Sequence, residues 1–69
     1  MRIVSVINRS LGCKAKVYYN SEYSEYVVKY WDCDGVQLSE STFYYTDDKD
    51  DAISTAHREL DFMIERETI

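Results

Sequence analysis

Alternating apolar and polar positions dominate the first two thirds of this chain, and a helical period dominates the last third. Four runs rich in β-branched, aromatic or alternating side chains predict strands, and they cover residues 2–8, 14–19, 26–31 and 36–45. Turns are expected over residues 9–12, over 20–24, and at Asp32-Cys33-Asp34-Gly35, where glycine tolerates positive φ. A bulge near Glu40 is expected in the last strand.

The loop lengths predict how these strands pair. If Asn20 lies opposite Glu25, the pairs on one face are Tyr19–Tyr26, Val17–Val28 and Ala15–Tyr30, all apolar or amphipathic. The other face then carries Lys14, Lys16, Tyr18, Val27, Lys29 and Trp31. A slip of one residue would mix the two sets, so this register is expected. Continued through the turn, it places Ser41, Phe43 and Tyr45 on the apolar side and Thr42 and Tyr44 on the other. The first strand stays ambiguous, because Ile3 with Ile7 and Val4 with Val6 are equally suitable inward pairs.

A helix is predicted from Asp47 or Asp48 to about Glu65. An aspartate cap and further aspartates in the first turn suit the positive end of a helix dipole. One stripe of the helix is apolar and is expected to cover the sheet, namely Ile53, Ala56, Leu60, Met63 and Ile64. Phe62 falls on the opposite side.

These elements predict a single α+β domain over residues 1–69. Its architecture is an antiparallel meander of three or four strands with one C-terminal helix packed on one face. A chain this short buries only about 60% of its unfolded surface, so the expected free energy of unfolding is roughly 3–10 kcal/mol.

Composition and charge indicate the kind of surface and the cellular location to expect. The net charge is −5, but residues 1–20 contain four basic residues and no acid, a basic hairpin on an acidic body. No apolar run approaches the ~20 residues of a membrane span, so no membrane association is expected. Two cysteines, Cys13 and Cys33, are too few for a disulfide scaffold, which predicts free thiols and a reducing cytoplasm.

The sequence contains few candidates for catalytic residues or metal ligands. His57 is the only histidine and sits at the edge of the helix stripe, where packing on the sheet is expected rather than catalysis. The register brings Cys13 near Cys33, which permits a disulfide or two metal ligands, but zinc needs four ligands at shorter spacings. Asp32-x-Asp34-Gly35 matches only part of a calcium loop. We therefore expect no enzyme, no cofactor and no metal.

Aromatic side chains give the clearest indication of function. Ten of the 69 residues are Tyr, Trp or Phe, and one helix can cover only one face of the sheet. The expected partner-binding surface is the other face, with Tyr18, Val27, Lys29, Trp31, Thr42 and Tyr44. An alternative acidic contact site is the helix start, with Asp47, Asp48, Asp50 and Asp51. Nucleic acid could instead use the basic hairpin and its aromatics, Arg2, Lys14, Lys16, Tyr18, Lys29 and Trp31, although the acidic body opposes it and no RNP-like motif is present.

Three segments carry a resemblance to a protein family. They are Tyr26-Val27-Val28-Lys29-Tyr30, then Asp34-Gly35, then the run from Tyr45 through Thr46-Asp47-Asp48-Lys49-Asp50-Asp51-Ala52 to Ala56. Over about residues 17–57 the chain resembles small uncharacterised accessory proteins of tailed bacteriophages. The resemblance implies a protein made in the cytoplasm of an infected bacterium, which binds and inhibits a host or host-defence protein. The alternatives are a homodimer that buries the open sheet face and Phe62, and a small nucleic-acid-binding protein.

Overall fold

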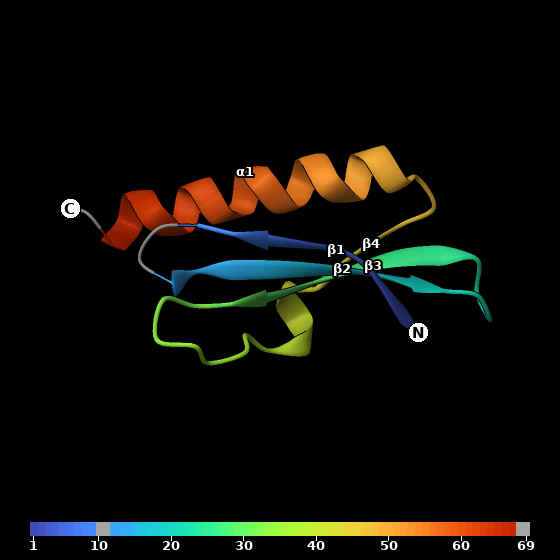
Figure 1. The fold of residues 1–69 in the computed structure, drawn as a ribbon, viewed down its shortest axis with the longest axis horizontal. Coiled ribbons are helices and arrows are strands. Elements are labelled where there is room, and N and C mark those ends of the chain that lie inside the picture. The colour runs from blue at the N-terminus through green and yellow to red at the C-terminus, as the bar shows by residue number, and fades with distance from the viewer. Residues whose placement is uncertain (10–11, 68–69) are drawn as a thin grey trace.

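A four-stranded antiparallel sheet with one helix across it makes up the fold. The computed structural model describes residues 1–9 and 12–67. The elements are β1 (Arg2–Asn8), β2 (Lys14–Asn20), β3 (Glu25–Trp31), the short 3₁₀ helix η2 (Glu40–Thr42), β4 (Tyr44–Thr46) and α1 (Lys49–Glu67). The strands lie in the order β1-β2-β3-β4, and α1 runs along one face of the sheet (Figure 1). The predicted meander with one C-terminal helix is confirmed. The turn predicted over residues 9–12 lies partly outside the described residues.

The central hairpin has the predicted register. Asn20 lies opposite Glu25, and the three apolar pairs follow in order, Tyr19–Tyr26, Val17–Val28 and Ala15–Tyr30. The Asn20 side chain accepts a hydrogen bond from the Glu22 N–H at 3.0 Å. Ser24 takes a φ of 51° and returns the chain to β3. The hydrogen bond of Asn20 and the turn at Ser24 therefore close the loop at the length that keeps the apolar residues of β2 and β3 on one face.

A bulge in β1 resolves the ambiguity of that strand. Its register with β2 shifts between Ile3 and Ser5, so that Ile3 lies opposite Tyr18 whereas Ser5 lies opposite Val17. The extra residue reverses which side chains face the helix. Ile7 is buried, while Ile3 is 52% exposed. Neither of the two inward pairs considered from the sequence is therefore correct.

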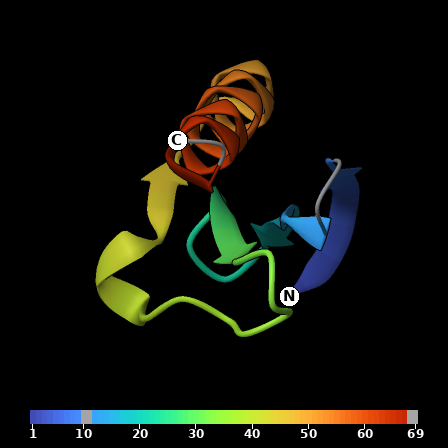
Figure 2. The ribbon, with the colours of Figure 1, turned by 90° about the vertical axis from the view of Figure 1, so that its left-hand side faces the viewer.

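The segment after Trp31 differs from the predicted long strand. A single bridge joins Trp31 to Gln37. The chain then turns through η2 on the side of the sheet away from α1, and rejoins the sheet only at β4 (Figures 1 and 2). Polar residues fill this excursion, Ser39-Glu40-Ser41-Thr42, and hydrogen bonds of 3.0 and 3.1 Å close its turns.

The excursion reverses the facing of the last strand. Val28 lies opposite Tyr44, and Val27 opposite Tyr45. Tyr44 thus packs on the helix side, while Tyr45 faces away and is 54% exposed. The predicted inward set of Ser41, Phe43 and Tyr45 was wrong, as was the outward placement of Tyr44. The physical reason is that a 3₁₀ turn does not alternate its side chains as a strand does, so the count from the hairpin cannot cross it.

The helix begins and packs as its sequence indicates. Asp48 is the cap, since its carboxylate accepts the Asp50 N–H at 2.9 Å and the Asp51 N–H at 3.3 Å. Leu60 and Ala56 are fully buried on the sheet. Ile53, Met63 and Ile64 pack around them, while Ala52 and Thr55 extend the buried stripe beyond what was predicted. Phe62 is 50% exposed, as expected. Within the described residues, no helix is long and apolar enough to cross a bilayer.

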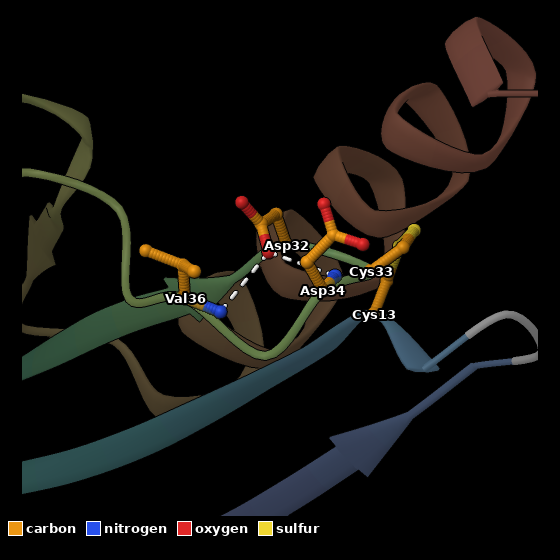
Figure 3. The surroundings of a disulfide bond; sticks show 5 residues. All are labelled: Cys13, Asp32, Cys33, Asp34 and Val36. Atoms are coloured by element: carbon orange, nitrogen blue, oxygen red, sulfur yellow. Dashed lines mark hydrogen bonds between the residues drawn. A yellow bond between two sulfur atoms is a disulfide. The ribbon is translucent and has the colours of Figure 1, made fainter.

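A disulfide joins Cys13, at the start of β2, to Cys33, in the turn after β3 (Figure 3). The prediction of free thiols was wrong. The central register places residue 14 opposite residue 31, and the chain then bends back at the turn. Asp32 fixes that bend by accepting the N–H groups of Asp34 and Val36 at 2.9 and 3.0 Å. The two cysteines therefore approach to a Cα–Cα distance of 4.2 Å, which permits the bond the sequence had left open.

Candidate functional site

The sheet face away from α1 gathers lysines and aromatic rings from three parts of the chain. We call the lysine–aromatic face the set Lys14, Lys16, Tyr18, Lys29, Trp31 and Phe43. Across the central hairpin, Lys14 lies opposite Trp31, and Lys16 lies directly opposite Lys29. Phe43 joins them because the chain through η2 returns beside β3, where Phe43 contacts Lys29. The face is therefore a product of strand alternation on β2 and β3 and of the excursion before β4.

Each ammonium group on this face lies over a ring. The Nζ atoms of Lys14 and Lys16 are 5.3 and 4.9 Å from the centre of the Trp31 ring. The Nζ atom of Lys29 is 4.8 Å from the Tyr18 ring and 5.4 Å from the Phe43 ring. Such contacts at exposed sites contribute about 0.5–1 kcal/mol each. They hold the long lysine side chains against the sheet and give the face an ordered pattern of charge and ring.

These lysines have no acidic partner among the residues that the structure describes. None of the three forms an ion pair with another residue that the structure describes; the described ion pair joins Arg9 to Asp61 at 3.2 Å. Lys16 and Lys29 are like charges in directly opposite cross-strand positions, an arrangement that destabilises a hairpin. The acids of the helix lie in a different layer, across the sheet. The lysine–aromatic face is thus a positive surface on a protein of net charge −5.

The predicted partner-binding residues are only partly together. Tyr18, Lys29 and Trp31 lie on the lysine–aromatic face as expected. Val27 points to the same side but is only 2% exposed, so a partner could barely touch it. Thr42 is exposed in η2, where its hydroxyl donates to the Ser39 carbonyl at 2.7 Å, and it is not part of the sheet.

Tyr44 does not belong to this site. Its hydroxyl donates a 2.5 Å hydrogen bond to Asp51 at the start of α1. That bond raises the pKa of Tyr44 and, from the other side, lowers the pKa of the Asp51 carboxyl. Tyr44 therefore ties β4 to the helix. Phe43 and Tyr45 take its place on the other side of the sheet, and the run of four polar residues before Phe43 is the signal that could have revealed the break in alternation.

The surroundings of the face are apolar on one side and acidic at one end. On β1, Ile3 and Val6 face the same way and are 52% and 46% exposed. Beyond Lys29 the surface is hollowed into a shallow open depression between β3 and the excursion, where Glu25 and Glu40 lie near Phe43. The acidic residues therefore border the face at its Lys29 and Phe43 end, away from Lys14 and Trp31.

The acidic helix start has a mainly structural explanation. Asp48 caps the helix and Asp51 accepts the Tyr44 hydroxyl. Asp47 and Asp50 are exposed. Of the four aspartates considered as a contact site, two are therefore held by the fold and two are on its surface.

His57 lies in a contact between the helix and the end of β1. His57 is exposed on α1, and its Nδ1 atom contacts the Arg9 guanidinium, which also bonds Asp61. This contact fastens the end of β1 to the helix. Among residues 1–9 and 12–67, no group of three or more His, Cys, Asp or Glu side chains is arranged to hold a metal ion.

Comparisons of the chain with protein-family models, with curated proteins and with solved structures find no match.

Proposed function

We propose that this protein is a non-enzymatic binding module whose lysine–aromatic face holds an anionic surface of a component of an infected bacterium. The resemblance to tailed-bacteriophage accessory proteins suggests the setting, and with it inhibition of a host or host-defence protein by occupation of its surface. The proposal rests chiefly on one observation. Lys16 and Lys29 oppose each other in the middle of an ordered cluster of rings, without a carboxylate partner in the described part of the chain.

The energetics of this pair favour a binding role over a structural one. A hairpin selected for stability alone would place opposite charges at facing positions, because like charges there are destabilising. An anionic partner would relieve the repulsion between Lys16 and Lys29 on binding. Trp31 adds a large ring beside these charges, and loss of an interfacial tryptophan typically costs 2 kcal/mol or more, roughly a thirtyfold weakening.

The test compares variants of the face with variants of the helix surface. Lys16→Glu should create an attractive pair with Lys29, stabilising the fold by about 0.2–1 kcal/mol, and should abolish binding of the host component captured by the native protein. Trp31→Ala should weaken that binding about thirtyfold. Lys49→Glu and Phe62→Ala change the same chemistry on α1, where both residues are exposed, and should leave binding unchanged.

Two results would contradict the proposal. One is a captured component that both face variants retain as well as the native protein does. The other is equal loss with the face and helix variants, which would place the contact elsewhere. Sedimentation of the purified protein at micromolar concentration separates the homodimer alternative: a dimer that Trp31→Ala dissociates would mean that the partner of the face is a second copy.

A second candidate function follows from the same arrangement. Lysines interleaved with rings on a sheet suit single-stranded nucleic acid as well as an acidic protein surface. The pattern of charge and ring on the face discriminates between these two partners.

A further inference from the structure

The lysine–aromatic face repeats cation and ring at the spacing of alternate strand residues. On β2, Lys14, Lys16 and Tyr18 follow one another at intervals of two residues, about 6.6–6.8 Å. On β3, Lys29 and Trp31 lie opposite them, about 4.8 Å away across the hairpin. A flat surface of this kind offers positive charges in a row with rings beside them.

The rings distinguish one class of anionic partner from another. An acidic peptide could pair with the ammonium groups, but its carboxylate side chains carry no aromatic ring to stack on Trp31 and Tyr18. Bases of a single strand have such a surface, whatever their sequence, and each base is followed by a phosphate. In a duplex the bases are stacked on one another and cannot reach the rings.

The lysines can exchange their present contacts for phosphates at little cost. They lie over Trp31, Tyr18 and Phe43 and have no ion pair with a described residue. A phosphate that draws an ammonium group aside therefore breaks no salt bridge, and it exposes a ring for stacking. It also relieves the opposition of Lys16 and Lys29.

The negative net charge does not forbid this partner. Packed layers are separated by about 10 Å, and charges in water are screened over about 8 Å at physiological ionic strength. The carboxylates on the outer side of α1 are therefore largely screened from the opposite face of the sheet. Glu25 and Glu40 are closer, in the depression that Lys29 and Phe43 also line, and they border the site on the side away from Lys14 and Trp31.

We propose that the lysine–aromatic face binds single-stranded nucleic acid, with backbone phosphates on Lys14, Lys16 and Lys29 and bases stacked on Trp31 and Tyr18. At the spacing of the lysines along β2, the site has room for about two or three nucleotides. It contacts the ring faces of the bases rather than their edges. This inference rests on the proposed function, because it uses the same face.

Binding is measured first with the native protein. Trp31 is the only tryptophan in the chain, so its fluorescence reports directly on stacking. The probes are twelve-nucleotide oligothymidylate and oligouridylate, a duplex of the same length, and polyglutamate. We expect both single strands to quench Trp31, and the duplex and polyglutamate to do so at least tenfold more weakly. Three neutralised phosphates predict a slope of about −2 for log affinity against log salt.

Variants then separate the two parts of the site, with anisotropy of a labelled oligothymidylate as the readout. Lys16→Gln should reduce the salt slope by about 0.7. Trp31→Ala should lower affinity about fivefold or more and leave the slope unchanged. Lys49→Gln and Phe62→Ala on α1 are the matched controls, because both residues are exposed on the helix, on the other side of the sheet from the cluster. Neither control should change affinity or slope.

The outcomes distinguish this inference from the proposed function. Equal binding of oligothymidylate and oligouridylate identifies the shared phosphate and base chemistry as the ligand, while tighter binding of oligouridylate assigns the site to RNA through its 2′-hydroxyl groups. Polyglutamate or duplex binding as tight as the single strands would overturn the inference, as would controls that weaken binding as much as the face variants. If the oligonucleotides fail to bind while a host protein is still held through Trp31, the inference fails and the proposed function stands with an acidic protein surface as partner. If neither ligand depends on the face, both fail.

Discussion

Leu60 is the side chain on which the contact between helix and sheet most depends. It is completely buried and is the largest of the fully buried side chains. Leu60→Ala removes three carbon atoms, about 2.4 kcal/mol of lost burial at 0.8 kcal/mol per methylene. A cavity that relaxes only partly adds to this, so the total expected loss is about 3–4 kcal/mol. Against a margin of roughly 3–10 kcal/mol for a chain of this size, that loss is large.

The assay is thermal and urea unfolding, followed by circular dichroism at 222 nm and by Trp31 fluorescence. A loss of about 3 kcal/mol should lower the Tm by roughly 12–24 °C. Phe62→Ala is the matched control, because it removes a larger side chain from the same helix at a position that is 50% exposed. It should change stability by no more than about 0.5 kcal/mol. If Leu60→Ala shifts the Tm no further than Phe62→Ala does, the helix packs on the sheet through another face and the core described above is wrong.

Three further predictions follow from single contacts. Tyr30 has a buried hydroxyl without a hydrogen-bond partner among the described residues, and burial raises its pKa to about 12, so Tyr30→Phe should stabilise the fold by about 1 kcal/mol in urea unfolding. Because that folded pKa lies above the ordinary value of about 10, the native protein should lose stability between pH 10 and 12, and the variant should lose less; parallel curves would exclude the burial of this hydroxyl. Asp48→Ala should cost about 1 kcal/mol through loss of the helix cap, whereas Asp47→Ala should cost less than about 0.5 kcal/mol, and calorimetry that ranks them the other way would reassign the cap. The native protein should take no alkylating label without reduction, and for a sequence separation of 20 residues reduction should cost about 3 kcal/mol; two labels at the outset would show that Cys13 and Cys33 are unpaired.

Local features of the sequence predicted the parts of the fold that depend on nearby residues. The register of the central hairpin follows from one short loop and from two sets of side chains that cannot be exchanged. The cap at Asp48 and the stripe through Leu60 follow from helix period and dipole alone. In each case the residues that decide the structure lie within a few positions of one another.

The errors arose where a distant residue decides the structure. The bulge in β1 depends on how Ile3 and Ser5 pair with β2, and no residue pattern within β1 itself predicts it. Tyr44 faces the helix because η2 interrupts the alternation, and Asp51 then accepts its hydroxyl. The disulfide of Cys13 and Cys33 depends on the bend of the turn after β3. For the candidate site, alternation correctly placed the residues on β2 and β3, while those after the excursion were misplaced by one position.

At the lysine–aromatic face the sequence does not give the most stable hairpin, and this favours a binding role for the face. Several other charges of this small protein have local explanations: Asp48 caps a helix, Asp32 closes a turn, and Arg9 bonds Asp61. Lys16 and Lys29 pack over rings, but they are like charges in directly opposite positions, where an acid in place of either would attract the other. The repulsion at this pair therefore offsets part of the stability that the ring contacts contribute, in a domain whose margin of stability is small. Local rules of stability are typically broken at functional sites, and a ligand with negative charge and flat rings would remove the repulsion between the two lysines while it stacks on the rings beside them.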